Sequence, residues 1–144
     1  MGAKAVPMNL AEIVPACRAG LIDAAENNIL SFEMQKHNDA FKYYCHTDHS
    51  MLPELLLFSK KRWKTLPPDV QALITEAARE SVPLMRRFWR EREDSARKNV
   101  IAAGTVIVKG VDKASFRNAM RPVYDRFVSS PQQKALFLAI KEMK

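Results

Sequence analysis

The sequence predicts an α/β fold in which short strands alternate with helices, and three features carry this prediction. Apolar residues recur at helical spacing through residues 68–103, the longest such stretch in the chain. A β-branched segment at residues 105–108 follows Gly104 and is typical of a strand. Residues that favour helix starts precede several shorter periodic segments.

The chain begins with a predicted strand and a capped helix. Residues 3–8 are expected to form a strand or the end of one, because Pro7 favours extended backbone. Asn9 and Glu12 have the spacing of a capping box, so a helix should start after Asn9. Gly20 is expected to end that helix, and Pro15 within it predicts a kink or an early break.

The next two segments are predicted from their apolar pattern. Residues 21–25 are mostly apolar or small, which favours a buried strand. Residues 29–37 favour a second helix. Residues 49–58 are expected to form an extended, largely buried strand, with Pro53 at an edge or bulge.

The remainder of the chain is expected to be mostly helical. Ser59 should cap a short helix that ends before Pro67 and Pro68. The long helix then follows, and Pro83 inside it predicts a bend. Two further helices should begin after Asp112 and after Ser130, the latter with Pro131 at its favoured first position.

Composition limits the class of protein more than its function. The 144 residues carry a net charge of +7, which suits an anionic partner without saying which kind. No apolar stretch is long enough to span a bilayer, and the N-terminus lacks the pattern of a secretory signal. Cys17 and Cys45 allow at most one disulfide, and we interpret both as buried apolar side chains.

No motif in the sequence supports catalysis, a cofactor or a metal site, so we do not expect an enzyme. Four neighbouring residues are possible metal ligands, but their spacing is wrong for a common zinc site. Histidines in such a position more often form hydrogen bonds with polar groups near the end of a strand. These residues are Cys45, His46, Asp48 and His49.

Basic residues gather on the long helix near Phe88 and Trp89, which could form a surface for nucleic acid. Acidic side chains lie in the same turns and would repel phosphate, so a solvated, ion-paired helix face is the better interpretation. Opposite charges lie four apart at Glu93/Arg97 and Asp94/Lys98. The basic residues are Arg86, Arg87, Arg90, Arg92, Arg97 and Lys98.

Asn27 has two interpretations. It follows a predicted buried strand, within the turn 26–28, whose amide side chains we expect to be exposed. An amide can donate to a carboxylate without the desolvation cost of a full charge, and ligands of open α/β sheets lie beyond the carboxyl ends of strands. Spacing alone favours a turn-forming asparagine.

A family resemblance favours the ligand-binding interpretation. The order and spacing of many short segments hold along essentially the whole chain. These segments are residues 2–8, 20–28, 36–37, 42–44, 47–50, 53–54, 59–63, 66–68, 80–83, 103–104 and 122–125. Together they resemble the C-terminal half of a substrate-binding protein from a tripartite ATP-independent periplasmic (TRAP) transporter.

The resemblance implies part of a two-lobed periplasmic binding protein fold, with a long kinked helix that bridges the lobes. Residues 1–52 and 93–144 would belong to the C-terminal lobe. Residues 53–92 would supply a hinge strand and a helix segment that belong to the N-terminal lobe in the family. The implied partners are an organic acid and the membrane subunits of the transporter, with no nucleic acid and no cofactor.

The resemblance also implies three substrate-binding residues. Asn27 matches the family's asparagine that helps to bind the substrate carboxylate. Leu10 matches a position, often aromatic, that packs on the ligand, and Glu54 lines the cleft, where it could accept hydrogen bonds from substrate hydroxyls. The Glu26-Asn27-Asn28 form resembles members that take sugar acids such as uronates.

The resemblance covers no N-terminal lobe and no upstream arginine that pairs with the carboxylate. We therefore expect the isolated chain to bind substrate poorly, because one amide cannot replace a bidentate arginine. We also expect possible self-association through surface that the missing lobe would cover. The full-length family protein would work in the periplasm.

Overall fold

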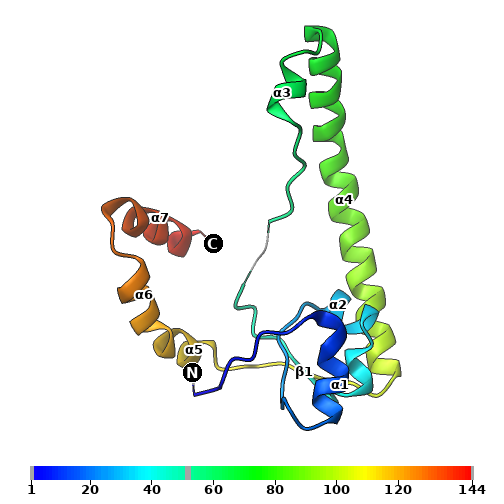
Figure 1. Cartoon of the computed structure of the whole chain (residues 1–144), viewed down its shortest axis with the longest axis vertical. Helices are drawn as coiled ribbons and strands as arrows, with labels where there is room; N and C mark the ends of the chain where they lie inside the picture. The colour runs from blue at the N-terminus through cyan, green and yellow to red at the C-terminus, as the bar shows by residue number, and fades with distance from the viewer. Residues whose placement is uncertain (1, 51–52, 144) are drawn as a thin grey trace. The chain divides into compact units, whose positions relative to one another are not determined.

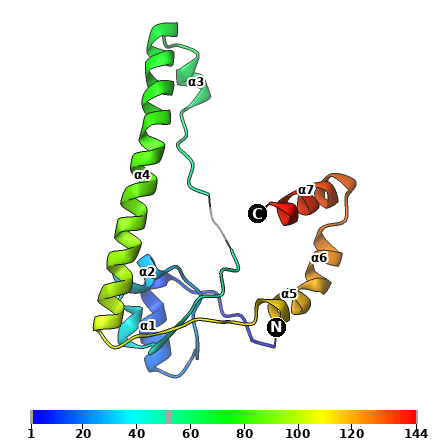
Figure 2. The ribbon, with the colours of Figure 1, turned by 180° about the vertical axis from the view of Figure 1, so that it is seen from behind.

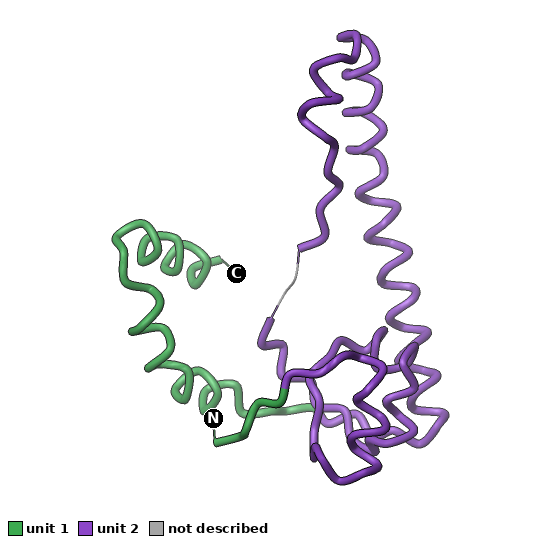
Figure 3. Tube along the Cα trace, viewed as in Figure 1, with its two compact units in different colours: residues 1–6, 109–144 green, residues 7–108 purple. Residues whose placement is uncertain are grey.

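The structure is a computed structural model that describes residues 2–50 and 53–143. The chain divides into two units, one formed by residues 7–108 and the other by residues 1–6 and 109–144 (Figure 3). Both helices and strands are present, which confirms the predicted mixed fold.

The unit of residues 7–108 is built around one long helix (Figure 1). Its elements in chain order are η1 (Leu10–Glu12), α1 (Ile13–Arg18), α2 (Ile29–Met34), η2 (His37–Asp39), β1 (Tyr43–Cys45), α3 (Lys60–Trp63), α4 (Pro68–Ala102) and β2 (Val106–Val108). Helix α2 lies beside the C-terminal part of α4, and α3 lies beside its first turns, as Figures 1 and 2 both show.

The two strands pair in parallel, with Tyr43 opposite Val106 and Cys45 opposite Val108. The connection between them contains α3 and α4. Because the strands are parallel, their carboxyl ends lie at the same edge, which is where ligands of α/β proteins bind. The segment 105–108 was predicted as a strand, and β2 confirms it.

A small apolar core joins α2 to the C-terminal part of α4. Ala96 and Val100 are 0% and 1% exposed, because they lie one turn apart on the helix face that meets α2. The rings of Phe41 and Tyr44 and the side chain of Ile107 pack against this core. The residues that α2 contributes are Ile29, Leu30 and Phe32. The core therefore fixes both α2 and the sheet on α4.

The first helix starts as its sequence predicts. Oε2 of Glu12 accepts from the backbone N–H of Asn9 at 3.0 Å. Gly20 ends the segment with φ of +70°, a conformation that L side chains rarely adopt. The expected break at Pro15 is wrong, because η1 forms the first turn and α1 starts only at Ile13. Pro15 therefore lies in the first turn of α1, where its missing N–H costs little.

Three predicted strands are wrong. The described residues of 3–8, 21–25 and 49–58 are irregular, and residues 51 and 52 of the last segment lie outside the described part of the chain. Far from being buried, Leu21 is 73% exposed and Leu57 is 80% exposed. The physical reason is that β1 and β2 pair with each other, and no third strand pairs with them within residues 2–50 and 53–143.

The helices of the middle region are confirmed. Ser59 caps α3, with its Oγ accepting from the backbone N–H of Arg62 at 3.5 Å. Helix α4 has Pro68 at its first position and continues through Pro83 to Ala102. The chain then passes through Gly104, whose φ is +95°.

The unit of residues 1–6 and 109–144 contains three short helices, α5 (Lys113–Ala119), α6 (Arg121–Phe127) and α7 (Pro131–Glu142). Oδ1 of Asp112 caps α5, and Ser130 with Gln133 forms a capping box for α7, so both predicted caps are confirmed. Among the described residues, none of the helices combines the length and apolar character needed to cross a membrane.

Candidate ligand site

The candidate site lies where the turn 26–28 meets the end of β1. The hydroxyl of Tyr44 donates to the backbone carbonyl oxygen of Asn27 at 3.1 Å. In the loop that follows β1, Nε2 of His49 lies 3.6 Å from Oε1 of Glu26. These two contacts bring Asn27, the residue predicted to bind a carboxylate, beside the carboxyl end of the sheet.

The side-chain amide of Asn27 is held in one orientation. Its Oδ1 accepts from the backbone N–H of Asn28 at 2.9 Å, which identifies the other amide atom as Nδ2. Nδ2 is buried and has no hydrogen-bond partner. The expectation of an exposed amide is therefore wrong for Asn27. Its Nδ2 is instead a buried donor without an acceptor.

Helix α2 starts at Ile29, two residues after Asn27, and is anchored at both ends. Oδ1 of Asn28 caps it by accepting from the N–H of Ser31 at 2.8 Å. Near its other end, Oε1 of Glu33 accepts from Nδ2 of Asn99 at 2.8 Å, and Oε2 pairs with Arg92. The hydrogen bonds from Asn99 and Arg92 hold the pKa of Glu33 below its usual value.

Tyr44 is the link between the core and the site. Its ring meets the ring of Phe32 edge-on at 5.1 Å and that of His46 at 5.2 Å. Burial raises the pKa of Tyr44, and the nearby Arg97 opposes that rise. The hydroxyl consequently keeps its proton near neutral pH, as its donation to Asn27 requires.

The residues considered as metal ligands lie at the last position of β1, Cys45, and in the loop that follows it. His46 lies 3.7 Å from a carboxylate oxygen of Asp48, and Nδ1 of His49 lies 2.7 Å from Oγ1 of Thr47. No group of three ligands that could hold a metal ion occurs in the part of the chain that the structure describes. The two histidines contact polar groups beyond the end of the strand.

The two cysteines are free in this structure. Cys17 is half-buried, and its Sγ lies 3.9 Å from the carbonyl oxygen of Ala40. Cys45 is exposed, so its interpretation as a buried apolar side chain is wrong. It lies at the end of a two-stranded sheet, where fewer elements cover side chains than in a larger sheet.

The other two predicted site residues lie on different elements. Leu10 starts η1 and is 46% exposed, and Glu54 is exposed in the irregular segment before α3. No hydrogen bond or ion pair of the described residues joins either side chain to Asn27. Their roles as ligand contacts remain predictions.

Sequence reasoning missed the roles of two arginines on α4. Arg92 pairs with Glu33, and Nη1 of Arg97 lies 2.7 Å from Nε2 of His46. Arg87 and Glu91, four residues apart on the same helix, form an ion pair at 3.8 Å. Arg92 lies 59 residues from Glu33 and Arg97 lies 51 residues from His46, so local spacing in the sequence could not reveal either contact.

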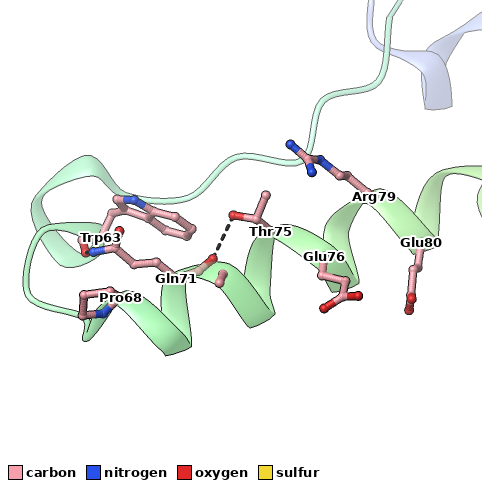
Figure 4. A pocket seen from close by; sticks show the side chains of 8 residues that line it. Trp63, Pro68, Gln71, Thr75, Glu76, Arg79 and Glu80 are labelled. Atoms are coloured by element: carbon pink, nitrogen blue, oxygen red, sulfur yellow. Dashed lines mark hydrogen bonds between the residues drawn. The ribbon is translucent and has the colours of Figure 1, made fainter.

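A groove of about 710 Å³ lies elsewhere, on α3 and the first turns of α4 (Figure 4). Trp63 and Gln71 lie beside each other in its lining, where Nε2 of Gln71 donates to the carbonyl oxygen of Trp63 at 3.0 Å. The full lining is Trp63, Pro68, Gln71, Ala72, Thr75, Glu76, Arg79 and Glu80. None of the three predicted substrate-binding residues contributes to it.

The parallel strands, the long helix and the amide at the sheet edge define an α/β protein with a candidate site for a small polar ligand. The chain belongs to the family described as bacterial extracellular solute-binding protein, family 7, whose model matches residues 1–130. This membership confirms the resemblance predicted from the sequence.

Solved structures of TRAP periplasmic solute-binding proteins match nearly the whole chain. One from Bradyrhizobium sp. BTAi1, in complex with galacturonate, is 44% identical with a TM-score of 0.79, covering 96% of this chain and 46% of its own. One from Xanthobacter autotrophicus Py2, with bound β-D-galacturonate, is 40% identical with a TM-score of 0.83, and the match covers 99% of this chain and 48% of that protein. One from Chromohalobacter salexigens, with bound D-glucuronate, is 34% identical with a TM-score of 0.87, covering 98% and 47%.

The chain spans less than half the length of the relatives it matches. This agrees with the predicted correspondence to the C-terminal half of such a protein. The matching structures also confirm the fold class, a partial periplasmic binding protein fold with one long helix.

Proposed function

We propose that this chain is the C-terminal half of a periplasmic solute-binding protein that captures a uronate for uptake, and that Asn27 binds the uronate carboxylate. The observation that supports this role is the buried Nδ2 of Asn27, a donor without an acceptor. Such a group is costly unless another state of the protein gives it a partner. A carboxylate is a strong acceptor and would supply one.

The class of ligand is inferred from the relatives. The three structures described above hold galacturonate or glucuronate, at 34–44% identity to this chain. The two that hold galacturonate are the more similar pair of the three. Galacturonate is therefore the first ligand to test, with glucuronate as the second.

The buried position of Nδ2 sets a condition for binding. A carboxylate can meet this atom only after the Asn27 side chain turns outward, which breaks the bond from the N–H of Asn28. That N–H can then bind water or the ligand. This rotation of the Asn27 side chain exchanges an unpaired buried donor for a charge-assisted hydrogen bond, so its net cost in free energy is small.

Leu10 and Glu54 complete the proposed contacts. Leu10 would pack on the apolar face of the sugar ring, and its exposure leaves that side chain accessible. Glu54, exposed before α3, would accept hydrogen bonds from sugar hydroxyls. Neither residue is tied to another side chain by a hydrogen bond or ion pair within the described residues.

We also propose that the chain contributes to both lobes of the binding protein. Residues 1–52 and 93–144 would belong to the C-terminal lobe, and residues 53–92 would cross to the other lobe. Large apolar side chains are exposed in two stretches: Val82, Leu84, Met85, Phe88 and Trp89 on α4, and Leu55, Leu56 and Leu57 before α3. An apolar surface of this kind normally has a partner, which we propose is the other lobe.

The whole protein would work in the periplasm and deliver its ligand to membrane subunits of the transporter. Alone, the chain would use the same apolar surface to self-associate. Nucleic acid is not an expected partner, because Arg92 and Arg97 are engaged within the fold and Arg87 pairs with Glu91. Salt-dependent binding to duplex DNA would favour that alternative instead.

A hybrid protein tests the proposal. This chain would replace the matching half of the Bradyrhizobium protein, and calorimetry would measure binding of galacturonate, glucuronate and the neutral sugar galactose. We expect the hybrid to bind a uronate and not galactose, and the 144-residue chain alone to bind neither tightly. A folded hybrid that binds no uronate would contradict the proposal, as would micromolar binding by the chain alone.

A further inference from the structure

We propose that Arg97 is a positioning residue of the candidate site: by donating to Nε2 of His46, it fixes the loop after β1 beside the turn that contains Asn27. The proposal rests on the proposed function for the importance of that site. The contact itself is a property of this chain without ligand, so it can be tested separately.

The contact defines which nitrogen of His46 carries the proton. Nη1 of Arg97 lies 2.7 Å from Nε2 of His46. A guanidinium is always protonated and can only donate, so Nε2 must be the acceptor. The remaining proton of a neutral imidazole is then on Nδ1, which faces Oδ1 of Asp48 at 3.7 Å.

This orientation matters because the loop turns sharply just after His46. Asp48 has φ of +46°, in the left-handed region that a non-glycine residue enters only with support from its surroundings. His46 supplies such support, since its ring is held between Arg97 on one element and the ring of Tyr44 on another. The N–H of His46 also donates to the carbonyl oxygen of Val108 at 3.3 Å.

The loop then reaches the site. His49, three residues after His46, lies beside Glu26, the residue before Asn27. Helix α4 thus holds both sides of the site: Arg92 and Asn99 hold α2 through Glu33, and Arg97 holds the loop through His46. Arg97 is only partly exposed, whereas Arg86, Arg87 and Arg90 on the same helix are exposed.

The test uses nitrogen NMR of the imidazole rings in the 144-residue chain, without ligand. We expect His46 to carry its proton on Nδ1, with Nε2 unprotonated. In Arg97→Met, which keeps an apolar stem but removes the donor, the Nδ1–H form should lose its preference, and the amide signals of residues 46–50 and of Glu26 should shift or broaden. Arg90→Met, at an exposed arginine of the same helix, should change neither.

Two results would overturn the proposal. One is a wild-type His46 with its proton on Nε2, a result that needs no variant and decides the matter even if Arg97→Met does not fold. The other is a folded Arg97→Met chain in which the ring and the loop signals match those of the wild type. Because no uronate is present, these outcomes are independent of the calorimetry that tests ligand binding.

Discussion

The hydroxyl of Tyr44 donates to the backbone carbonyl oxygen of Asn27, across 3.1 Å and 17 residues of sequence. This bond joins the end of β1 to the turn that starts α2. Tyr44 also packs on Phe32 in the core, so the position of Asn27, the proposed carboxylate-binding residue, depends on the core.

Tyr44→Phe removes this bond and keeps the ring. We expect it to lower the free energy of unfolding by about 1 kcal/mol, the usual contribution of one hydrogen bond. It should also shift the backbone amide signals of Asn27 and Asn28. Tyr43→Phe is the matched control, because Tyr43 is 61% exposed. Equal effects from the two variants would show that the bond is not made in solution.

The Glu33 carboxylate should make stability depend on pH. Its pKa is held below the ordinary value of 4.5, so its contribution to stability is present above that value and is lost as the pH falls through the folded-state pKa. Wild type should therefore lose more unfolding free energy than Glu33→Gln between roughly pH 5 and pH 3. Denaturant unfolding at several pH values would measure this difference. Parallel curves for the two proteins would contradict it.

The contact of Val100 with α2 should hold the core together. Val100→Ala removes buried methyl groups from a side chain that is 1% exposed. We expect a loss of about 1–3 kcal/mol in unfolding free energy. Ile101→Ala, at a neighbouring side chain that is 50% exposed, should cost much less. Urea unfolding followed by circular dichroism would compare them, and similar losses would argue against the described core.

The exposed leucines of the segment before α3 should cause self-association. Leu55, Leu56 and Leu57 are 72%, 79% and 80% exposed. We expect the 144-residue chain to form concentration-dependent oligomers in sedimentation experiments, and Leu56→Ser to weaken them. Leu21→Ser changes an equally exposed leucine outside this run and serves as the control. A strictly monomeric wild-type chain would contradict the prediction.

Local signals in the sequence were sufficient to predict most of the helices. Capping residues and apolar periodicity placed α3, α4 and α7 close to their observed bounds and the start of α5 after Asp112, but the one helix expected there is divided into α5 and α6. The predicted strands at residues 3–8, 21–25 and 49–58 failed for a different reason. A strand needs a partner, and apolar composition cannot show whether that partner exists within the chain.

The site was predicted only in part. Asn27 could be singled out because a family resemblance gave it a role, whereas its spacing alone favours a turn-forming asparagine. The contacts of Arg97 with His46 and of Arg92 with Glu33 join residues more than 50 positions apart. Only the folded arrangement of α2, β1 and α4 brings them together.

The central claim is that the amide of Asn27 binds the carboxylate of a uronate. Calorimetry of galacturonate binding to the hybrid protein tests it most directly, with Asn27→Ala compared to Asn118→Ala, which changes an exposed asparagine on α5. Loss of a hydrogen bond to a charged group should weaken binding by about 1.5–3 kcal/mol, or roughly 10- to 100-fold, in Asn27→Ala alone. Unchanged affinity in a folded Asn27→Ala hybrid would contradict the claim.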